Sequence, residues 1–224
     1  MAARKTRGRP KNATLQAVRR EQILDAAAPI FAQHGYRQTD VQFVADALVL
    51  GKGTVYRYFP SKAALFLAAA DRWMRRCSER IHAAVAAIDD PLEVVVCATD
   101  AYLKFFQDHP EHVELLIQER AEFRDRKKPT YYEHRDAQLG PWQDLLRGLI
   151  AAGRIRPIPV ERVAAVISDL LYGTMFTNYF ADQVPSSERQ AEAILDVVFH
   201  GILTDAERAR RRAANPHRKK RHRS

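Results

Sequence analysis

The segment Gly51-Lys52-Gly53-Thr54-Val55-Tyr56-Arg57-Tyr58-Phe59-Pro60-Ser61-Lys62 decides the fold of this 224-residue chain. Val55 and Phe59 stand four residues apart, so they share one helical face and can pack against a core. Pro60-Ser61 then breaks the chain and caps the next helix. The segment therefore predicts a helix over Lys52–Tyr58 that packs on one side and can touch a polyanion on the other.

A second short helix is expected just before this segment. Thr39 and Gln42 fit a capping box that opens a helix over Val41–Leu48. Only Val49-Leu50-Gly51 separates the two helices, a spacing typical of a helix-turn-helix, whose second helix enters the DNA major groove. The residues expected to contact DNA carry small, polar, basic or phenolic groups on or beside these helices: Thr39, Lys52, Gly53, Thr54, Tyr56, Arg57, Tyr58 and Lys62.

The remaining sequence also predicts helices, without useful β-alternation, internal repeats or a glycine-rich phosphate loop. One of them, over about 131–153, is expected to be interrupted near Gly140-Pro141. The predicted fold is all-α, with an N-terminal three-helix DNA-binding domain and a larger C-terminal helical bundle. We expect a disordered basic arm over residues 1–19 and a DNA-binding domain over 20–66, whose last helix continues to about 87. A ligand-binding and dimerisation domain is expected over 67–205, and a disordered basic tail over 206–224.

Composition narrows the class of protein. Hydrophobic residues make up 46% of the chain, enough for a substantial core. No apolar run approaches the ~20 residues of a membrane span, and no signal peptide is visible. Cys77 and Cys97 lack metal-ligand spacing, which fits a reduced cytoplasmic protein. No nucleophile–base pair, carboxylate pair or cofactor loop is legible, so we predict neither an enzyme nor a cofactor.

The net charge of +9 is concentrated at the two ends of the chain. Residues 1–20 carry +7 and residues 206–224 carry +8, which leaves −6 for the 185 residues between them. Within the first arm, Arg7, Arg9 and Lys11 surround a Gly and a Pro in a pattern that resembles an AT-hook. An extended strip of this kind can place arginines in an A·T-rich minor groove, and the alternative is loose attraction to phosphates. The basic tail adds non-specific DNA affinity, binds another acidic partner, or is only a solvated segment.

Residues 20–66 resemble the DNA-binding region of the TetR family of bacterial transcriptional regulators. The resemblance implies a homodimeric repressor with a palindromic operator, a variable C-terminal domain for ligand binding and dimerisation, and a nucleoid-associated location in the bacterial cytoplasm. It also implies that Val55 and Phe59 belong to the core and that the following residues contact DNA: Thr39, Lys52, Gly53, Thr54, Tyr56, Tyr58 and Lys62. The matching stretches are 20–27, 31–36, Thr39, 44–45, 52–56 and 59–65.

Three positions depart from the family pattern. Val49 stands where the turn usually has a glycine, so the turn is expected to be either reshaped or strained. Gly51 replaces the usual Ser or Thr cap of the recognition helix. Phe43 is apolar where a polar residue is common. These departures bear on the pose of the recognition helix.

Two groups of residues in the C-terminal domain are assigned to functions, against the alternative that they only form core. An apolar cavity between helices is expected to bind a small apolar or amphipathic effector. Its predicted wall is Phe105, Leu116, Glu119, Phe123, Trp142, Tyr172 and Phe176; for Glu119 the alternative is a surface pair with an arginine. Apolar stripes on the last two helices are expected to form the dimer interface: Ile167, Leu170, Leu171, Thr174, Ile194, Leu195, Val198, Phe199 and Ile202.

The histidines His109 and His112, with Glu111 and Glu114, allow two interpretations. Their spacing is compatible with metal ligands, but no convergent third ligand is evident in the sequence. We therefore interpret them as helix-terminal histidines and predict no metal site.

The sequence thus predicts a homodimeric, sequence-specific DNA-binding regulator, a repressor that a small ligand releases from its operator. The alternative is an architectural DNA-binding protein that relies on its basic arms and has no small-molecule effector.

Overall fold

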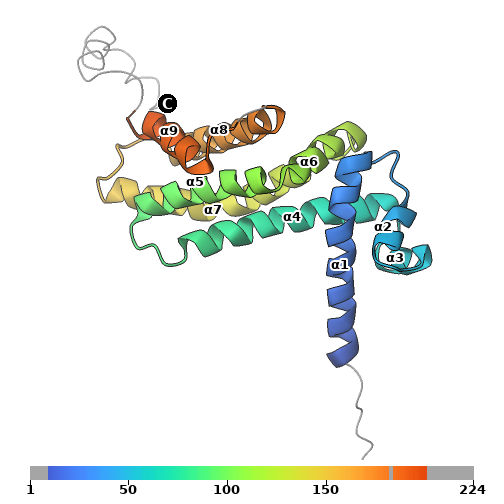
Figure 1. Cartoon of the computed structure of the whole chain (residues 1–224). Coiled ribbons are helices and arrows are strands. Elements are labelled where there is room, and N and C mark those ends of the chain that lie inside the picture. Colours follow the sequence, from blue (N-terminus) through green and yellow to red (C-terminus); the bar gives the residue numbers. More distant parts are fainter. Residues whose placement is uncertain (1–9, 182–183, 201–224) are drawn as a thin grey trace, which may run out of the picture.

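Helices form every regular element in residues 10–181 and 184–200, the part of the chain that this computed structural model describes (Figure 1). None of these helices is both long and apolar enough to cross a lipid bilayer. The elements are α1 (Pro10–His34), α2 (Val41–Ala47), α3 (Lys52–Tyr58), α4 (Lys62–Val85), α5 (Pro91–Asp108), α6 (Pro110–Glu122), α7 (Thr130–Ala151), α8 (Val160–Phe180) and α9 (Ser187–His200).

The first three helices and the start of α4 enclose an N-terminal core. Val55 and Phe59 are buried in it, which confirms their predicted packing. The recognition helix has the predicted bounds, and Ser61 caps α4 by accepting a hydrogen bond from the backbone N–H of Ala64 at 3.0 Å. α1 ends at His34, and the next residue, Gly35, has a φ of 78°, which suits a glycine.

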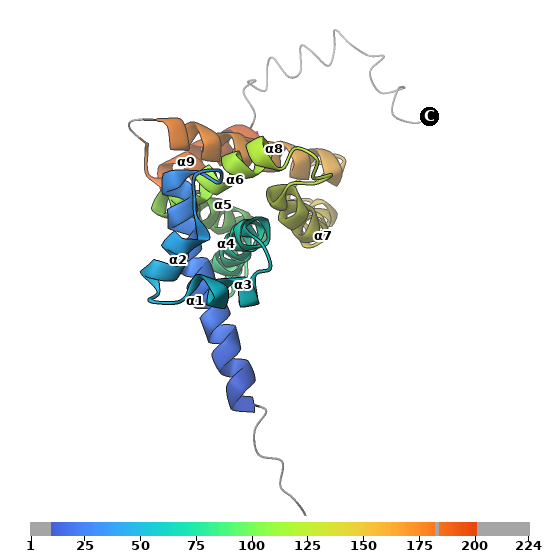
Figure 2. The same ribbon diagram turned by 90° about the vertical axis from the view of Figure 1, so that its right-hand side faces the viewer.

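Two predicted boundaries were wrong. The basic arm was expected over residues 1–19, but α1 already begins at Pro10 and its first half projects away from the body (Figures 1 and 2). α7 was expected to break near Gly140-Pro141, but it is continuous. Pro141 leaves the carbonyl of Ala137 without its helical partner, and this side of α7 is exposed, so water can hydrate that carbonyl.

The C-terminal helices pack around α5, which lies against α4 on one side and against α8 and α9 on the other (Figures 1 and 2). Asp90 caps α5 through the backbone N–H of Leu92 at 2.7 Å, as the Asp-Pro pair predicts. The core of this bundle is rich in aromatic and sulfur-containing side chains, including Met74, Tyr102 and Met175.

Helix α6 belongs to both cores. Its Leu115 is buried in the N-terminal core, and Phe123, just after α6, packs there with ring centroids 5.0 Å from Tyr36 and 5.5 Å from Phe66. The side-chain amide of Gln118 donates to the carbonyl of Phe31 in α1 at 2.9 Å. The DNA-binding unit is therefore completed by a helix of the C-terminal bundle.

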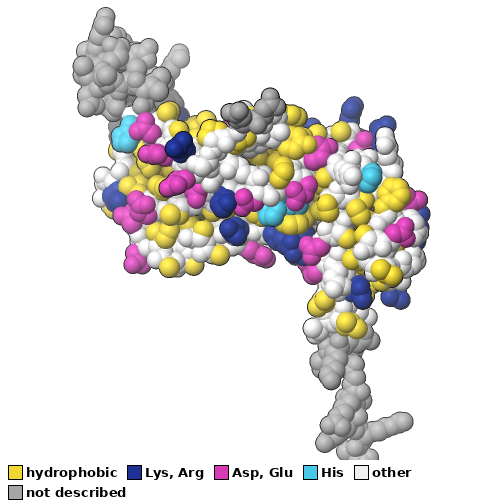
Figure 3. Space-filling view, viewed as in Figure 1, with side chains coloured by type: hydrophobic (Ala, Val, Ile, Leu, Met, Phe, Trp, Pro, Cys, Tyr) yellow, Lys and Arg dark blue, Asp and Glu magenta, His cyan; other side chains and the backbone are white. Residues whose placement is uncertain are grey.

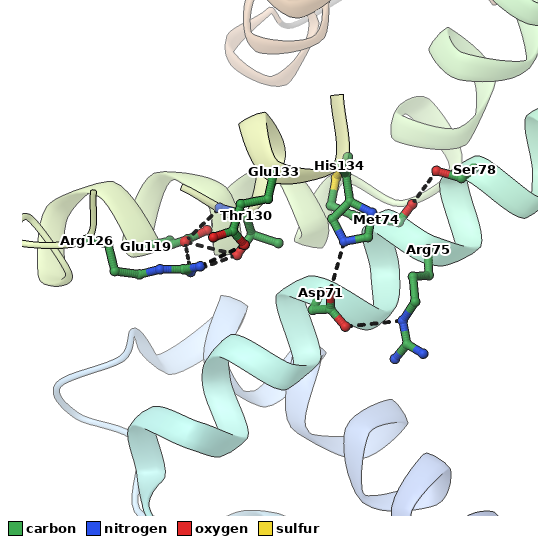
Figure 4. Close-up of polar contacts among 9 residues, drawn as sticks. All are labelled: Asp71, Met74, Arg75, Ser78, Glu119, Arg126, Thr130, Glu133 and His134. Atoms are coloured by element: carbon green, nitrogen blue, oxygen red, sulfur yellow. Dashed lines mark hydrogen bonds and ion pairs between the residues drawn. The ribbon is translucent and has the colours of Figure 1, made fainter. Parts of the chain in front are cut away.

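Glu119 of α6 joins that helix to α7 (Figure 4). Its carboxylate is buried and accepts from the backbone N–H and the hydroxyl of Thr130, both at 3.0 Å, and from Arg126. It takes the place of a capping side chain, because the residue before α7 is Pro129 and supplies none. Arg126 also reaches Glu133 in the first turn of α7, at 2.9 Å.

Replacing Glu119 with alanine should lower the free energy of unfolding by about 3 kcal/mol, because it removes the cap of α7 and leaves the cationic partner without its buried carboxylate. Urea unfolding followed by circular dichroism measures the change. Glu133→Ala is the matched control, since this exposed partner of Arg126 should cost less than about 1 kcal/mol. Equal losses for the two variants would contradict the capping role.

Candidate DNA-binding surface and ligand cavity

The turn between α2 and α3 is a Schellman motif. The backbone N–H of Leu50 donates to the carbonyl of Ala45 at 2.8 Å, and that of Val49 donates to Asp46 at 3.0 Å. These two bonds satisfy carbonyls at the end of α2, and the motif that they form places Val49 in the left-handed region. The chain thus keeps the usual turn geometry although it has no glycine there.

Val49 carries the strain that this turn requires. Its φ is 54°, and it is the one non-glycine residue with positive φ in the described ranges 10–181 and 184–200. Its side chain is 93% exposed, so almost no packing offsets the left-handed penalty of roughly 1–2 kcal/mol. Of the two outcomes expected for this position, the structure shows strain rather than a reshaped turn.

The start of the recognition helix is held by charge rather than by a cap. Gly51 makes no side-chain capping bond, as expected. Lys52 instead forms an ion pair with Asp40 of α2, with 2.5 Å between Nζ and Oδ1. The backbone N–H of Gln42 and then Lys52 lower the pKa of Asp40, and the hydrogen bond from Lys52 to Asp40 raises the pKa of the lysine. The pair is exposed and therefore weak, so a phosphate can compete for the ammonium group.

The outward side of α3 carries hydrogen-bonding groups that can reach DNA. Tyr56 is 39% exposed, and Gly53 and Arg57 are also exposed. The guanidinium of Arg57 lies 5.7 Å from the ring centroid of Tyr58, which is half-buried like Thr54. These side chains belong to a helix whose other face is locked into the core, so their positions follow from that packing.

Two predicted DNA contacts are used inside the protein. Thr39 is buried and its hydroxyl donates to the carbonyl of Gly35 at 2.7 Å; the true cap of α2 is Asp40, a residue type that caps at least as well as threonine. Lys62 donates to the carbonyls of Arg37 and Thr39 at 3.0 and 3.1 Å, which ties α4 to the loop before α2. Both residues therefore position the motif, and the lysine keeps only one N–H for a phosphate.

Some predicted residues lie outside the described part of the chain. Arg7 and Arg9 of the proposed arm and Ile202 of the proposed dimer interface are among them. Lys11 falls within α1, so its backbone is helical and not extended as an AT-hook strip requires.

A cavity of about 170 Å³ lies between α4, α5, α7 and α8. Most of its wall is apolar, and Cys77 is part of it; burial raises the pKa of this thiol to about 12, so it stays protonated at neutral pH. Polar groups come from all four helices, among them Ser78 on α4, Thr99 on α5, Gln138 on α7 and Ser168 on α8. The cavity can therefore hold an apolar body and meet a few polar atoms.

The predicted wall of the ligand site largely does not coincide with this cavity. Of its seven residues only Trp142 lines this cavity. Phe105 and Leu116 are buried in the bundle core, Tyr172 and Phe176 pack against that core, and Phe123 belongs to the N-terminal core. Glu119 is buried as one interpretation held, but it caps α7 instead of facing the cavity. The positions of aromatic residues in the sequence do not indicate which helical faces border a cavity.

The described residues of the predicted dimer stripes lie on α8 and α9, but several of them are buried or half-buried within the single chain. Ile167 and Leu171 line the cavity, Leu195 is buried, and Ile194 packs against the bundle core. Thr174 and Val198 are half-buried, and Leu170 and Phe199 are exposed. The structure also exposes Val166 on α8 and Val197 on α9, which the predicted interface did not include.

We name the exposed set the outer apolar patch: Val166, Leu170, Val197 and Phe199. Each of these side chains is between 39% and 49% exposed. Hydrophobic side chains gather on the upper face of the molecule, where α8 and α9 lie (Figures 1 and 3).

Comparisons with known proteins concern both the helix-turn-helix unit and the C-terminal helical bundle. The family model described as "Bacterial regulatory proteins, tetR family" matches residues 23–69, which contain the whole helix-turn-helix. Residues 23–69 therefore match the DNA-binding region of the TetR family.

The similarity extends beyond this DNA-binding unit. The transcriptional repressor KstR2 of Mycobacterium tuberculosis is 28% identical over 190 residues, which cover 84% of this chain and 94% of the relative. The fold also matches the transcriptional regulator FadR of Bacillus subtilis, solved in complex with stearoyl-CoA (TM-score 0.68, 21% identity, 82% of this chain and 99% of that one). A further match is the TetR-family regulator PfmR of Thermus thermophilus (TM-score 0.66, 24% identity, 81% and 99%).

Replacing Val49 with glycine should raise the free energy of unfolding by about 1 kcal/mol. The left-handed penalty disappears, and the greater freedom of glycine in the unfolded chain cancels only part of the gain. Urea unfolding at 25 °C measures the difference. Val18→Gly is the matched control, because this exposed valine lies in a right-handed helix and its replacement should lower stability. A Val49→Gly protein no more stable than the parent would show that the turn is not strained.

Proposed function

We propose that this protein is a homodimeric transcriptional repressor of the TetR family that binds a palindromic operator in the cytoplasm and is released from it by a small, mainly apolar ligand. The observation that carries the proposal is the connection through α6, which lies in the N-terminal core and is joined to α7, a wall of the cavity. A DNA-reading surface and a ligand cavity are thus parts of one packed structure.

The DNA contacts proposed are those of α3. Arg57 and Lys52 offer cationic groups, Tyr56 offers an exposed hydroxyl, and Gly53 lets the backbone approach closely. Thr54 can meet a base edge or a thymine methyl group. Thr39 and Lys62 contribute by holding this helix and its brace in place. The arm residues Arg7 and Arg9 are proposed to reach the minor groove beside this site.

The size of the cavity limits the ligand class. An apolar protein cavity of about 150 Å³ accommodates benzene, so the 170 Å³ here suit a compact molecule of one ring or a short chain. A ligand as long as the stearoyl-CoA of the FadR complex would require the helices to move apart. The polar groups of Thr99, Gln138 and Ser168 favour a ligand with one or two hydrogen-bonding atoms.

The outer apolar patch is proposed as the centre of the dimer interface. Pairing α8 and α9 with the same helices of a second copy would bury Val166, Leu170, Val197 and Phe199. A two-fold pair places two recognition helices in symmetry-related positions, which a palindromic operator matches.

Operator binding tests the assignment of α3. DNA selected from a random pool by the full-length protein provides the probe, and fluorescence anisotropy measures its affinity. Tyr56→Ala and Arg57→Ala should each weaken binding by about 1–3 kcal/mol, roughly 5- to 150-fold. Arg80→Ala, an exposed arginine in the distal half of α4, is the matched control and should bind like the parent. Unchanged affinity in both α3 variants contradicts the assignment, and selection of no palindrome favours the architectural alternative.

Filling the cavity tests the effector site. Ala98→Phe places a ring of about the size of benzene into the cavity wall and should leave operator binding intact while abolishing release. The measurement is a screen of small amphipathic compounds for dissociation of the protein–DNA complex. Ala83→Phe, at an exposed position of the same bundle, should respond like the parent. Compounds that release the parent and the Ala98→Phe protein equally would place the effector elsewhere.

A further inference from the structure

The corner between α5 and α6 brings together three residues that can ligate a metal and that the DNA and cavity functions do not use. His109 is the single residue between α5 and α6, and Glu111 and His112 lie in the first turn of α6. One ligand atom from each residue lies within 4.8 Å of the others. Oε1 of Glu111 is 3.5 Å from Nδ1 of His109 and 3.3 Å from Nε2 of His112.

His112 is the unusual member of this cluster. Its side chain is 3% exposed, and within the described residues neither ring nitrogen makes a hydrogen bond. A neutral imidazole carries a lone pair on one ring nitrogen, which can bind a metal ion. A buried polar group without a partner costs about 1–3 kcal/mol, so helix-end packing alone does not account for this imidazole.

We propose that His109, Glu111 and His112 form a binding site for a divalent transition-metal ion, with zinc as the best fit. Two imidazoles and one carboxylate are a common donor set for zinc, and a water molecule can complete the tetrahedron. Ligand atoms about 2.0–2.1 Å from a tetrahedral ion lie roughly 3.3–3.5 Å apart, which matches the two distances to Glu111.

The surroundings are compatible with a bound cation. The positive end of α6 and Arg76 disfavour it, but the Glu111 carboxylate supplies a negative charge at the site and Arg76 is itself paired with Asp25 at 3.0 Å. Glu114, the other acidic residue nearby in sequence, is not needed, because it accepts from Tyr179 at 2.6 Å and from Gln118 at 2.9 Å.

A metal ion here would act on the joint that positions α6. The ring of His112 stacks on Trp73 of α4 with 3.5 Å between centroids, so the site touches a third helix. Holding His109 and His112 on one ion would fix the α5–α6 corner, at the opposite end of α6 from Phe123.

Calorimetric titration of the full-length, tag-free and metal-stripped protein with Zn²⁺ tests the site. The expected result is one ion per protomer and at least about tenfold weaker binding by His109→Asn and Glu111→Gln, both of which replace partly exposed residues and should fold. Glu93→Gln, in the equivalent first turn of α5, is the matched control and should bind like the parent. His217 and His222, outside the described residues, are common to all variants, so the differences between variants decide. No binding by the parent, or equal binding by every variant, would overturn the site.

A second readout separates this site from adventitious surface binding. Co²⁺ should give the visible absorption of a four-coordinate ion in the parent and in Glu93→Gln, and should not do so in Glu111→Gln. Zn²⁺ should also raise the melting temperature of the parent more than that of Glu111→Gln, because the ion binds only the folded corner. Equal spectra and equal shifts in the parent and Glu111→Gln contradict the proposal.

Discussion

The packing of Phe123 against Tyr36 and Phe66 is the contact on which the rest of the arrangement depends. It brings the end of α6 into the core that carries the recognition helix, and Gln118 secures the same helix to α1. A small three-helix unit buries limited apolar surface by itself, so an added aromatic ring is a substantial part of its stability. The position of the DNA-reading helix is therefore not independent of the C-terminal bundle.

Glu119 extends this dependence toward the cavity. It fixes the first residue of α7, and the next residue, Tyr131, is in the cavity wall and shares a hydroxyl contact of 3.2 Å with Tyr102. His134, also in the wall, is held to Asp71 of α4 at 2.8 Å (Figure 4). A ligand that fits the cavity better when α7 is displaced would favour a different position of α6 and hence of α1. Such a ligand must bind the two arrangements with different affinity, since equal binding shifts nothing.

The sequence predicted local features well because they depend on neighbouring residues. The bounds of α3 and the missing side-chain cap at Gly51 follow from short-range backbone chemistry, and the same chemistry identified Val49 as either strained or part of a reshaped turn. It predicted the cavity wall poorly because α5, α7 and α8 are apolar on several faces, and only their packing decides which face leaves a void. Glu119 illustrates the limit. The sequence left open whether this residue faces the cavity or pairs with an arginine at the surface, but it is buried and pairs with Arg126 from the loop before α7.

The strained turn has a consequence for how this protein can change. Val49 costs folding stability and is almost wholly exposed, so no neighbouring side chain depends on its shape. An average point mutation costs about 1 kcal/mol, which is comparable to the strain held at this single residue. A substitution that removes this strain would raise the free energy of unfolding by about as much as one destabilising substitution in the cavity lowers it, so the protein could tolerate both. A change at residue 49 could thus offset destabilising substitutions that alter the ligand specificity of the cavity, although Val49 does not line that cavity.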